Sequence, residues 1–114
     1  MASLSVENLF ISAVKIFLFE DNSITITFSP GGIQIRFPTT RRLAEFMQVP
    51  HYYILPYFAM MEEMQLVTRA ERVGILTPST GSMKLVSLMR DSFPRETSEI
   101  LGEKIFSEIL QGIK

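Results

Sequence analysis

The chain contains few side chains that could carry out catalysis or hold a metal ion. His51 is the single histidine, cysteine is absent, and no serine or acidic residue stands beside His51 at a recognisable catalytic spacing. Glu62 and Glu63 are adjacent in a segment with helical spacing, so their carboxylates point to different sides of the helix. We therefore expect no enzyme activity, no metal site and no cofactor, and we interpret His51 as a surface or capping residue at a helix start.

The composition predicts one globular domain over residues 1–114. Hydrophobic residues make up 46% and charged residues 20%, which is ordinary for a folded chain and does not indicate disorder. The absence of cysteine suits a reducing cytoplasm. No apolar run approaches the roughly 18 residues of a membrane span. We expect a cytoplasmic protein with no membrane partner.

The elements that would position the few reactive side chains are predicted over residues 39–90. Leu43 and Met47 stand four apart on one face of a first helix, which Thr39 or Thr40 can cap and which Val49-Pro50 ends. Apolar residues then recur at helical spacing, and a region of strand-like composition follows. The predicted elements are a helix over about Thr40–Gln48, a helix ending near Gln65, a strand within Val67–Leu76, a turn over Thr77–Ser82 and a strand over Met83–Leu88.

This order resembles the winged helix-turn-helix superfamily of transcriptional regulators, over residues 39–88. The resemblance is strongest in Leu43–Val49 and in Met61–Val67, which leads into the predicted hairpin, or wing. It implies that the second helix enters the DNA major groove and that the wing contacts the backbone or minor groove. Gln48 and Gln65 stand where glycine is usual, and the helix that usually precedes the unit is expected to be replaced by strands.

The outward face of the second helix does not fit direct reading of DNA bases. If Ile54, Phe58 and Met61 point inward, no arginine, lysine, asparagine or glutamine faces outward. Base recognition uses bidentate donors of these types, and phosphate contacts use positive charge. The outward residues are His51, Tyr52, Leu55, Pro56, Ala59 and Met60.

Positive charge is nevertheless concentrated in the winged-helix-like unit. The chain has a net charge of −1, but residues 39–90 hold six bases and four acids. The resemblance implies that the start of the first helix and the wing contact DNA phosphates, and that the start of the second helix lies near the major groove. The residues predicted to bind DNA are Arg41, Arg42, His51, Tyr52, Tyr53, Arg72 and Lys84.

Residues 9–38 are predicted to form an antiparallel β-meander. Ser23–Phe28 and Gly32–Phe37 alternate apolar and polar residues, and Ser29-Pro-Gly-Gly32 between them is a hairpin turn. The first strand is expected from about Ile11 to Phe19 because of its β-branched and aromatic content. A helix over Val6–Phe17 is the alternative, since its apolar residues also fit a period of 3.6.

Residues 94–112 are predicted to form a C-terminal amphipathic helix. Leu101, Ile105 and Ile109 mark an apolar stripe, and Pro94 suits the first helical turn. A terminal helix often carries the dimer contact in winged-helix regulators, so we expect a homodimer. The predicted fold class is therefore α+β: an N-terminal meander, a winged helix-turn-helix unit and a C-terminal helix.

Two functions from different classes remain. The resemblance narrowly favours a DNA-binding transcriptional regulator that contacts double-stranded DNA. The alternative is a protein–protein interaction module, an adaptor that uses the apolar outer face of its second helix. The residues predicted to bind a protein are Tyr52, Leu55, Ala59 and Met60.

Overall fold

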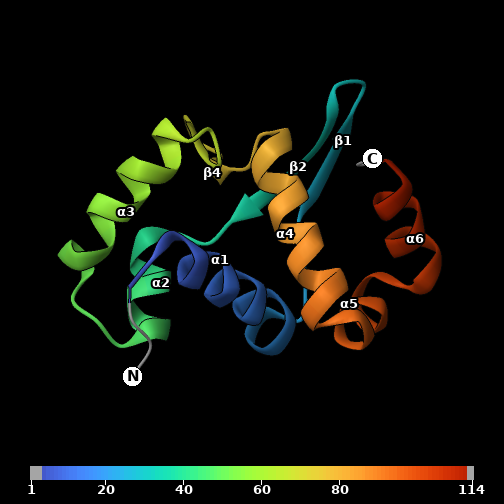
Figure 1. The fold of residues 1–114 in the computed structure, drawn as a ribbon, viewed down its shortest axis with the longest axis horizontal. Coiled ribbons are helices and arrows are strands. Elements are labelled where there is room, and N and C mark those ends of the chain that lie inside the picture. Colours follow the sequence, from blue (N-terminus) through green and yellow to red (C-terminus); the bar gives the residue numbers. More distant parts are fainter. Residues whose placement is uncertain (1–3, 113–114) are drawn as a thin grey trace.

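The computed structural model describes residues 4–112, which form helices packed against one face of a small antiparallel sheet (Figure 1). The fold is α+β, with the four strands in the order β1-β2-β4-β3. The N-terminal helical segment is α1 (Val6–Lys15), which continues as a π-helix, η1 (Ile16–Asp21). The remaining elements are β1 (Ile26–Ser29), β2 (Gly32–Phe37), α2 (Thr40–Met47), α3 (His51–Glu63), β3 (Thr68–Ala70), β4 (Gly74–Leu76), α4 (Ser79–Ser92), α5 (Pro94–Leu101) and α6 (Glu103–Gly112).

The predicted β-meander is wrong in its first strand, where the chain forms α1 and η1. The alternative, a helix over Val6–Phe17, is the one observed. Ser5 caps this helix, since its hydroxyl oxygen accepts a hydrogen bond from the Asn8 backbone N–H at 3.0 Å. The helix is buried around much of its circumference, because α2, α3 and α4 all contact it. The prediction that strands replace a helix before α2 is therefore also wrong.

The second half of the predicted meander is confirmed as a hairpin. Ile26 pairs with Ile35 and Ser29 with Gly32 in an antiparallel register. Strand β2 also pairs on its other side with β4, where Phe37 faces Ile75. Strand β2 is therefore central in the sheet, and its Ile35 and Phe37 side chains lie in the core.

The two predicted helices after the hairpin are confirmed close to their predicted bounds. The Thr39 hydroxyl accepts a hydrogen bond from the Arg42 backbone N–H at 3.1 Å and caps α2. Gln48 ends α2 with φ 58° and ψ 47°, and Gln65 follows α3 with φ 59°. Both positions thus have the left-handed backbone that favours glycine.

The predicted second wing strand over Met83–Leu88 is wrong, because these residues lie within α4. The hairpin is shorter and lies entirely within the predicted first strand: β3 pairs with β4, and Thr68 faces Leu76. Residues 77–82, predicted as a turn, lead into α4 and form its first turn. Serine, threonine and glycine are common in turns and also at helix starts, so composition alone did not separate the two structures.

The predicted C-terminal helix is confirmed as helical but is interrupted at Gly102. This residue has φ 87° and separates α5 from α6. A positive φ of this kind is available to glycine at little cost, so the chain turns here instead of continuing one helix. Figure 1 shows α6 and α3 at opposite ends of the long axis of the molecule.

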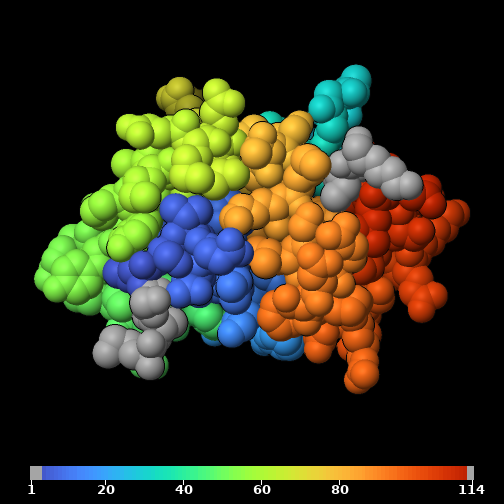
Figure 2. Space-filling view, viewed as in Figure 1, coloured from blue at the N-terminus to red at the C-terminus, as the bar shows by residue number. Residues whose placement is uncertain are grey.

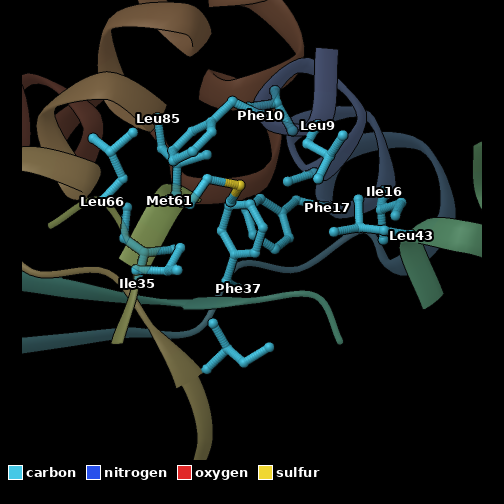
Figure 3. Packing of buried hydrophobic residues seen from close by; sticks show 14 of the residues in the cluster. Leu9, Phe10, Ile16, Phe17, Ile35, Phe37, Leu43, Met61, Leu66 and Leu85 are labelled. Atoms are coloured by element: carbon cyan, nitrogen blue, oxygen red, sulfur yellow. The ribbon is translucent and has the colours of Figure 1, made fainter. Parts of the chain in front are cut away.

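The core lies where the helices meet β2. Figure 3 shows Phe10 of α1, Met61 of α3 and Leu85 of α4 gathered beside Ile35 and Phe37 of β2. The Phe10 and Phe37 rings lie with their centroids 5.1 Å apart, within the range of favourable aromatic pairs. Helix α3 is therefore anchored to the sheet by one face.

Candidate interaction surface

The rotation of α3 about its own axis is set by its contacts with the core. Ile54, Phe58 and Met61 are fully buried, at spacings of four and three residues. The Phe58 ring meets the Phe37 ring edge to face, with centroids 5.8 Å apart. This arrangement leaves the opposite face of α3 directed away from the core.

The start of α3 is held against the start of α2. The His51 Nε2 atom lies 2.7 Å from the Thr40 Oγ1 atom, and the imidazole is half-buried. This contact places His51 beside the first turn of α2, where Arg41 is the next residue. Arg41 and His51 also line one shallow hollow, together with Ala44, Glu45, Gln48 and Val49. His51 therefore lies at the start of α3 as predicted, but it is neither fully exposed nor a cap of α3, since Pro50 precedes the helix and no side chain caps it.

The outward face of α3 is apolar and exposed, as the sequence predicts. Tyr52 is 65%, Leu55 41% and Met60 47% exposed. Pro56 and Ala59 are also exposed and lie between them on this face. Figure 2 shows α3, in yellow-green, along one flank of the molecule. We call these five residues the α3 face: Tyr52, Leu55, Pro56, Ala59 and Met60.

Two further exposed residues lie next to the α3 face, and only one of them was predicted as a binding residue. Tyr53, predicted for DNA binding, is exposed and forms an edge-to-face pair with Tyr52, with ring centroids 4.6 Å apart. Met64, which follows Met60 by one helical turn, is 54% exposed and was not among the predicted residues. Its spacing from Met60 was the signal that could have identified it.

Arg42, predicted to contact DNA phosphates, forms ion pairs with two carboxylates of the same chain. Its Nη2 atom lies 2.6 Å from Asp21 Oδ1 and 3.1 Å from Glu20 Oε1, at the end of η1. Hydrogen bonds to Asp21 and then to Glu20 raise the pKa of the Arg42 guanidinium above its usual value. Arg42 would have to leave both partners to bind a phosphate.

Lys84, predicted on the wing, lies instead on α4. Its Nζ atom is 2.9 Å from Glu7 Oε1 on α1 and 5.6 Å from the centre of the Phe10 ring. The predicted position on a wing is therefore wrong, because the helix places Lys84 against α1. Its ammonium group stabilises the junction of two helices through a charge pair and a cation–π contact.

Two of the predicted DNA-binding arginines have no carboxylate within ion-pair distance in the described part of the chain. Arg41 is exposed in the first turn of α2, and Arg72 is exposed in the β3–β4 turn, with φ 67°. Arg36, which was not predicted, lies near the same hairpin: an added Cβ at Gly74 would sit 3.8 Å from its Nε and Nη2 atoms. Its place on the polar face of β2 was the sequence signal for an exposed base.

The other surface features do not gather the predicted residues into a site. A hollow of about 570 Å³ lies between the β1–β2 turn, the start of α4 and α6, and none of the predicted binding residues lines it. Within residues 4–112, no helix is long and apolar enough to cross a membrane. No group of three or more histidine or acidic side chains in the same range is placed to hold a metal ion.

In comparisons with known proteins, no family model, no curated protein and no solved structure matches this chain.

Proposed function

We propose that this chain is a small, non-catalytic interaction module whose α3 face docks a helix of a protein partner. The proposal includes a winged-helix-like arrangement of α1, β2, α2, α3 and the β3–β4 hairpin. The observation that carries it is the α3 face itself: an exposed apolar strip on the helix that, in the resembling superfamily, would read DNA.

The order and pairing of the elements support the winged-helix-like arrangement. Helix α1 precedes β2, the α2–α3 pair follows, and the β3–β4 hairpin then returns to pair with β2. In this interpretation the short β3–β4 hairpin is the wing, and α4 follows it. The positive φ values of Gln48 and Gln65 fall at the two turns where the resemblance expects glycine.

The ion pairs that most basic residues at positions 39–90 form within the chain favour protein binding over DNA binding. The resemblance alone narrowly favoured DNA, and positive charge in residues 39–90, which hold two more bases than acids, would be needed for phosphate contacts. Four of those six bases are paired with acids of the same chain: Arg42, Arg69, Lys84 and Arg90. The α3 face adds no cation, so it offers little to a phosphate backbone.

The partner surface that fits the α3 face is an apolar helix stripe with a basic group at one end. Tyr52, Leu55 and Met60 supply large apolar contacts, while Ala59 leaves room for a second helix to approach. Glu63 is exposed at the carboxyl end of α3 and has no cation within ion-pair distance among residues 4–112. A base on the partner would meet this carboxylate.

The direct test is photo-crosslinking in cells that express the chain. A benzophenone amino acid replaces Ala59 in one variant and Ser107, exposed on α6, in the control. We expect a discrete adduct from position 59 and its loss when Met60→Glu is added in the same chain. Absence of any adduct from position 59, or an adduct unaffected by Met60→Glu, would overturn the proposal.

DNA binding is the second candidate, and Arg41 and Arg72 favour it because both are exposed and unpaired in the described structure. Its test is fluorescence anisotropy with a mixed-sequence duplex across a salt series. If DNA is the partner, changing both arginines to alanine weakens binding to all sequences and flattens the salt dependence, whereas Arg95→Ala on α5 does neither. We expect no binding even at low salt, which would leave protein contacts as the function.

A further inference from the structure

We propose that the partner of the α3 face is a second copy of this chain, and that the two α3 helices pair antiparallel across a two-fold axis. This inference rests on the proposed function, because it names the occupant of the same face. It differs from the predicted dimer contact on the C-terminal helix, which lies at the other end of the molecule (Figure 1).

The spacing of exposed residues along α3 is compatible with its own antiparallel copy. A two-fold axis passing between Pro56 and Ala59 sets Leu55 level with Met60 of the second copy along the helix axis, and Tyr52 level with Glu63. Each copy then supplies one large apolar residue on either side of the axis. The same residues on both copies therefore complete the contact.

The centre of this arrangement has the small side chains that close helix packing needs. Ala59 and Pro56 are the smaller members of the α3 face and would lie nearest the axis. Helices approach to about 8–10 Å when the residues at the crossing are small enough to interlock. Leu55 and Met60 would flank the crossing, where unbranched methionine can adapt to the facing surface.

The charges at the two ends of α3 are complementary only when the helices run in opposite directions. Near the amino end, Arg41 lines one hollow with His51 and with Glu45, and Arg41 has no carboxylate within ion-pair distance among the described residues. The carboxyl end carries Glu63, which has no ion-pair partner in the described chain. Antiparallel pairing brings Glu63 toward Arg41 of the second copy at both ends. It also sets the positive amino end of each helix dipole beside the negative carboxyl end of the other, which is favourable.

The same charges disfavour an anionic surface as the occupant. Glu62 and Glu63 lie at the carboxyl end of α3, and Arg69 already pairs with Glu62 at 3.4 Å. An apolar strip that binds anionic lipid carries bases along its polar border. The α3 face instead has Glu62 and Glu63 at its carboxyl end, and Glu45 lines the same hollow as Arg41 at its amino end, so acids at both ends would repel anionic headgroups.

The first experiment is sedimentation equilibrium of the full chain from micromolar to millimolar concentration. We expect a reversible dimer, and we expect Met60→Glu to raise its dissociation constant by about tenfold or more, since the change places a charge in the contact. Met83→Glu is the matched control: Met83 lies on α4 and is 46% exposed, against 47% for Met60. A monomer at every concentration, or equal effects of the two variants, would overturn the proposal.

A charge exchange tests the antiparallel arrangement itself. We expect Glu63→Arg and Arg41→Glu each to weaken the dimer, and the double variant to recover most of the loss, because each end of the pair is then complementary again. Glu99→Arg on α5 is the control for the charge change. A double variant weaker than either single variant would exclude the antiparallel arrangement.

The two proposals can fail separately. If the purified chain stays monomeric but position 59 crosslinks in cells to a protein of another mass, and Met60→Glu removes that adduct, the second copy is excluded and the interaction module stands. If the chain is monomeric and position 59 gives no adduct, both proposals are overturned. A crosslinked species of twice the chain mass, together with the dimer in solution, supports both.

Discussion

Helices α3 and α4 are similar in length but are held in different ways. The first turn of α4 is built into the junction between the sheet and the end of α3. Gly81 lies against the carbonyl of Leu66, and the hydroxyls of Thr77 and Ser82 bond to each other and to β2. Helix α3 is anchored by one buried stripe, and its opposite face is apolar and exposed.

This difference separates two roles for apolar helices in a small domain. At the start of α4, close contacts and hydrogen-bonded polar groups mean that even a small substitution changes the stability of the folded chain. On the α3 face, large side chains remain in water, where they contribute little to the stability of the single chain. We expect substitutions at the first region to change stability and substitutions at the second to change association.

The largest effect is expected at Gly81. An added Cβ would overlap the Leu66 carbonyl oxygen and would also lie 3.1 Å from the Thr77 Cβ atom. We expect Gly81→Ala to lower the free energy of unfolding by about 3 kcal/mol or more, because backbone must move to relieve the overlap. Urea denaturation followed by circular dichroism measures this loss.

Gly31→Ala is the control for that substitution, since no atom lies within 4 Å of an added Cβ there. We expect it to change the free energy of unfolding by less than about 0.5 kcal/mol. Equal losses at Gly31 and Gly81 would contradict the close contact between α4 and Leu66.

A smaller effect is expected from the buried hydroxyls. The Ser82 hydroxyl donates to the Ile33 carbonyl at 2.7 Å, and Thr77 Oγ1 accepts from the Ile35 backbone N–H at 3.0 Å. Ser82→Ala should lower the free energy of unfolding by about 1–3 kcal/mol, because buried groups lose a partner. Ser79→Ala, at an exposed hydroxyl on the same helix turn, should have almost no effect in the same denaturation experiment.

A gain in stability is expected where the chain adopts left-handed backbone without glycine. Gln48 has φ 58°, which costs an ordinary residue about 1–2 kcal/mol. Gln48→Gly should therefore raise the free energy of unfolding by about 0.5–1 kcal/mol after the greater freedom of glycine in the unfolded chain is subtracted. Gln111→Gly, at a helical position on α6, should give no gain, and a loss at position 48 would contradict the prediction.

The smallest effect is expected at the exposed pair Arg90–Asp91. The hydrogen bond from Arg90 lowers the pKa of the Asp91 carboxyl below its usual value. A lowered pKa in the folded state contributes stability above the unfolded pKa, and this contribution is lost as the pH falls through the folded pKa. In an NMR titration, Arg90→Gln should raise the pKa of Asp91 toward its ordinary value, and an unchanged pKa would contradict the contact.

The sequence by itself determined the parts of the fold that depend on short-range chemistry. Three local signals were enough to predict α2, the start of α3 and the β1–β2 hairpin: a threonine cap at Thr39 or Thr40, Pro50 after the turn, and the Pro-Gly-Gly between two alternating segments. The α3 face was also predictable, because the spacing of Ile54, Phe58 and Met61 determines which residues point outward.

Tertiary structure decided the elements whose local signals were balanced. The segment after Val6 has both helical spacing and strand-like composition, and it is a helix because three other helices bury it from several sides. Residues 79–88 read as a turn and a strand, but Gly81 lets them pack as a helix against Leu66. Propensity differences at these sites are small compared with the burial that long-range contacts provide.

Tertiary structure also decided which charges are free. Nothing in the sequence near Arg42 or Lys84 indicates their partners, because Asp21 and Glu7 lie 21 and 77 residues away along the chain. The fold brings these carboxylates to the two bases and leaves Arg41 and Arg72 unpaired among the described residues. Sequence therefore determined where the apolar face lies, while the balance of charge around it depended on contacts that only folding brings together.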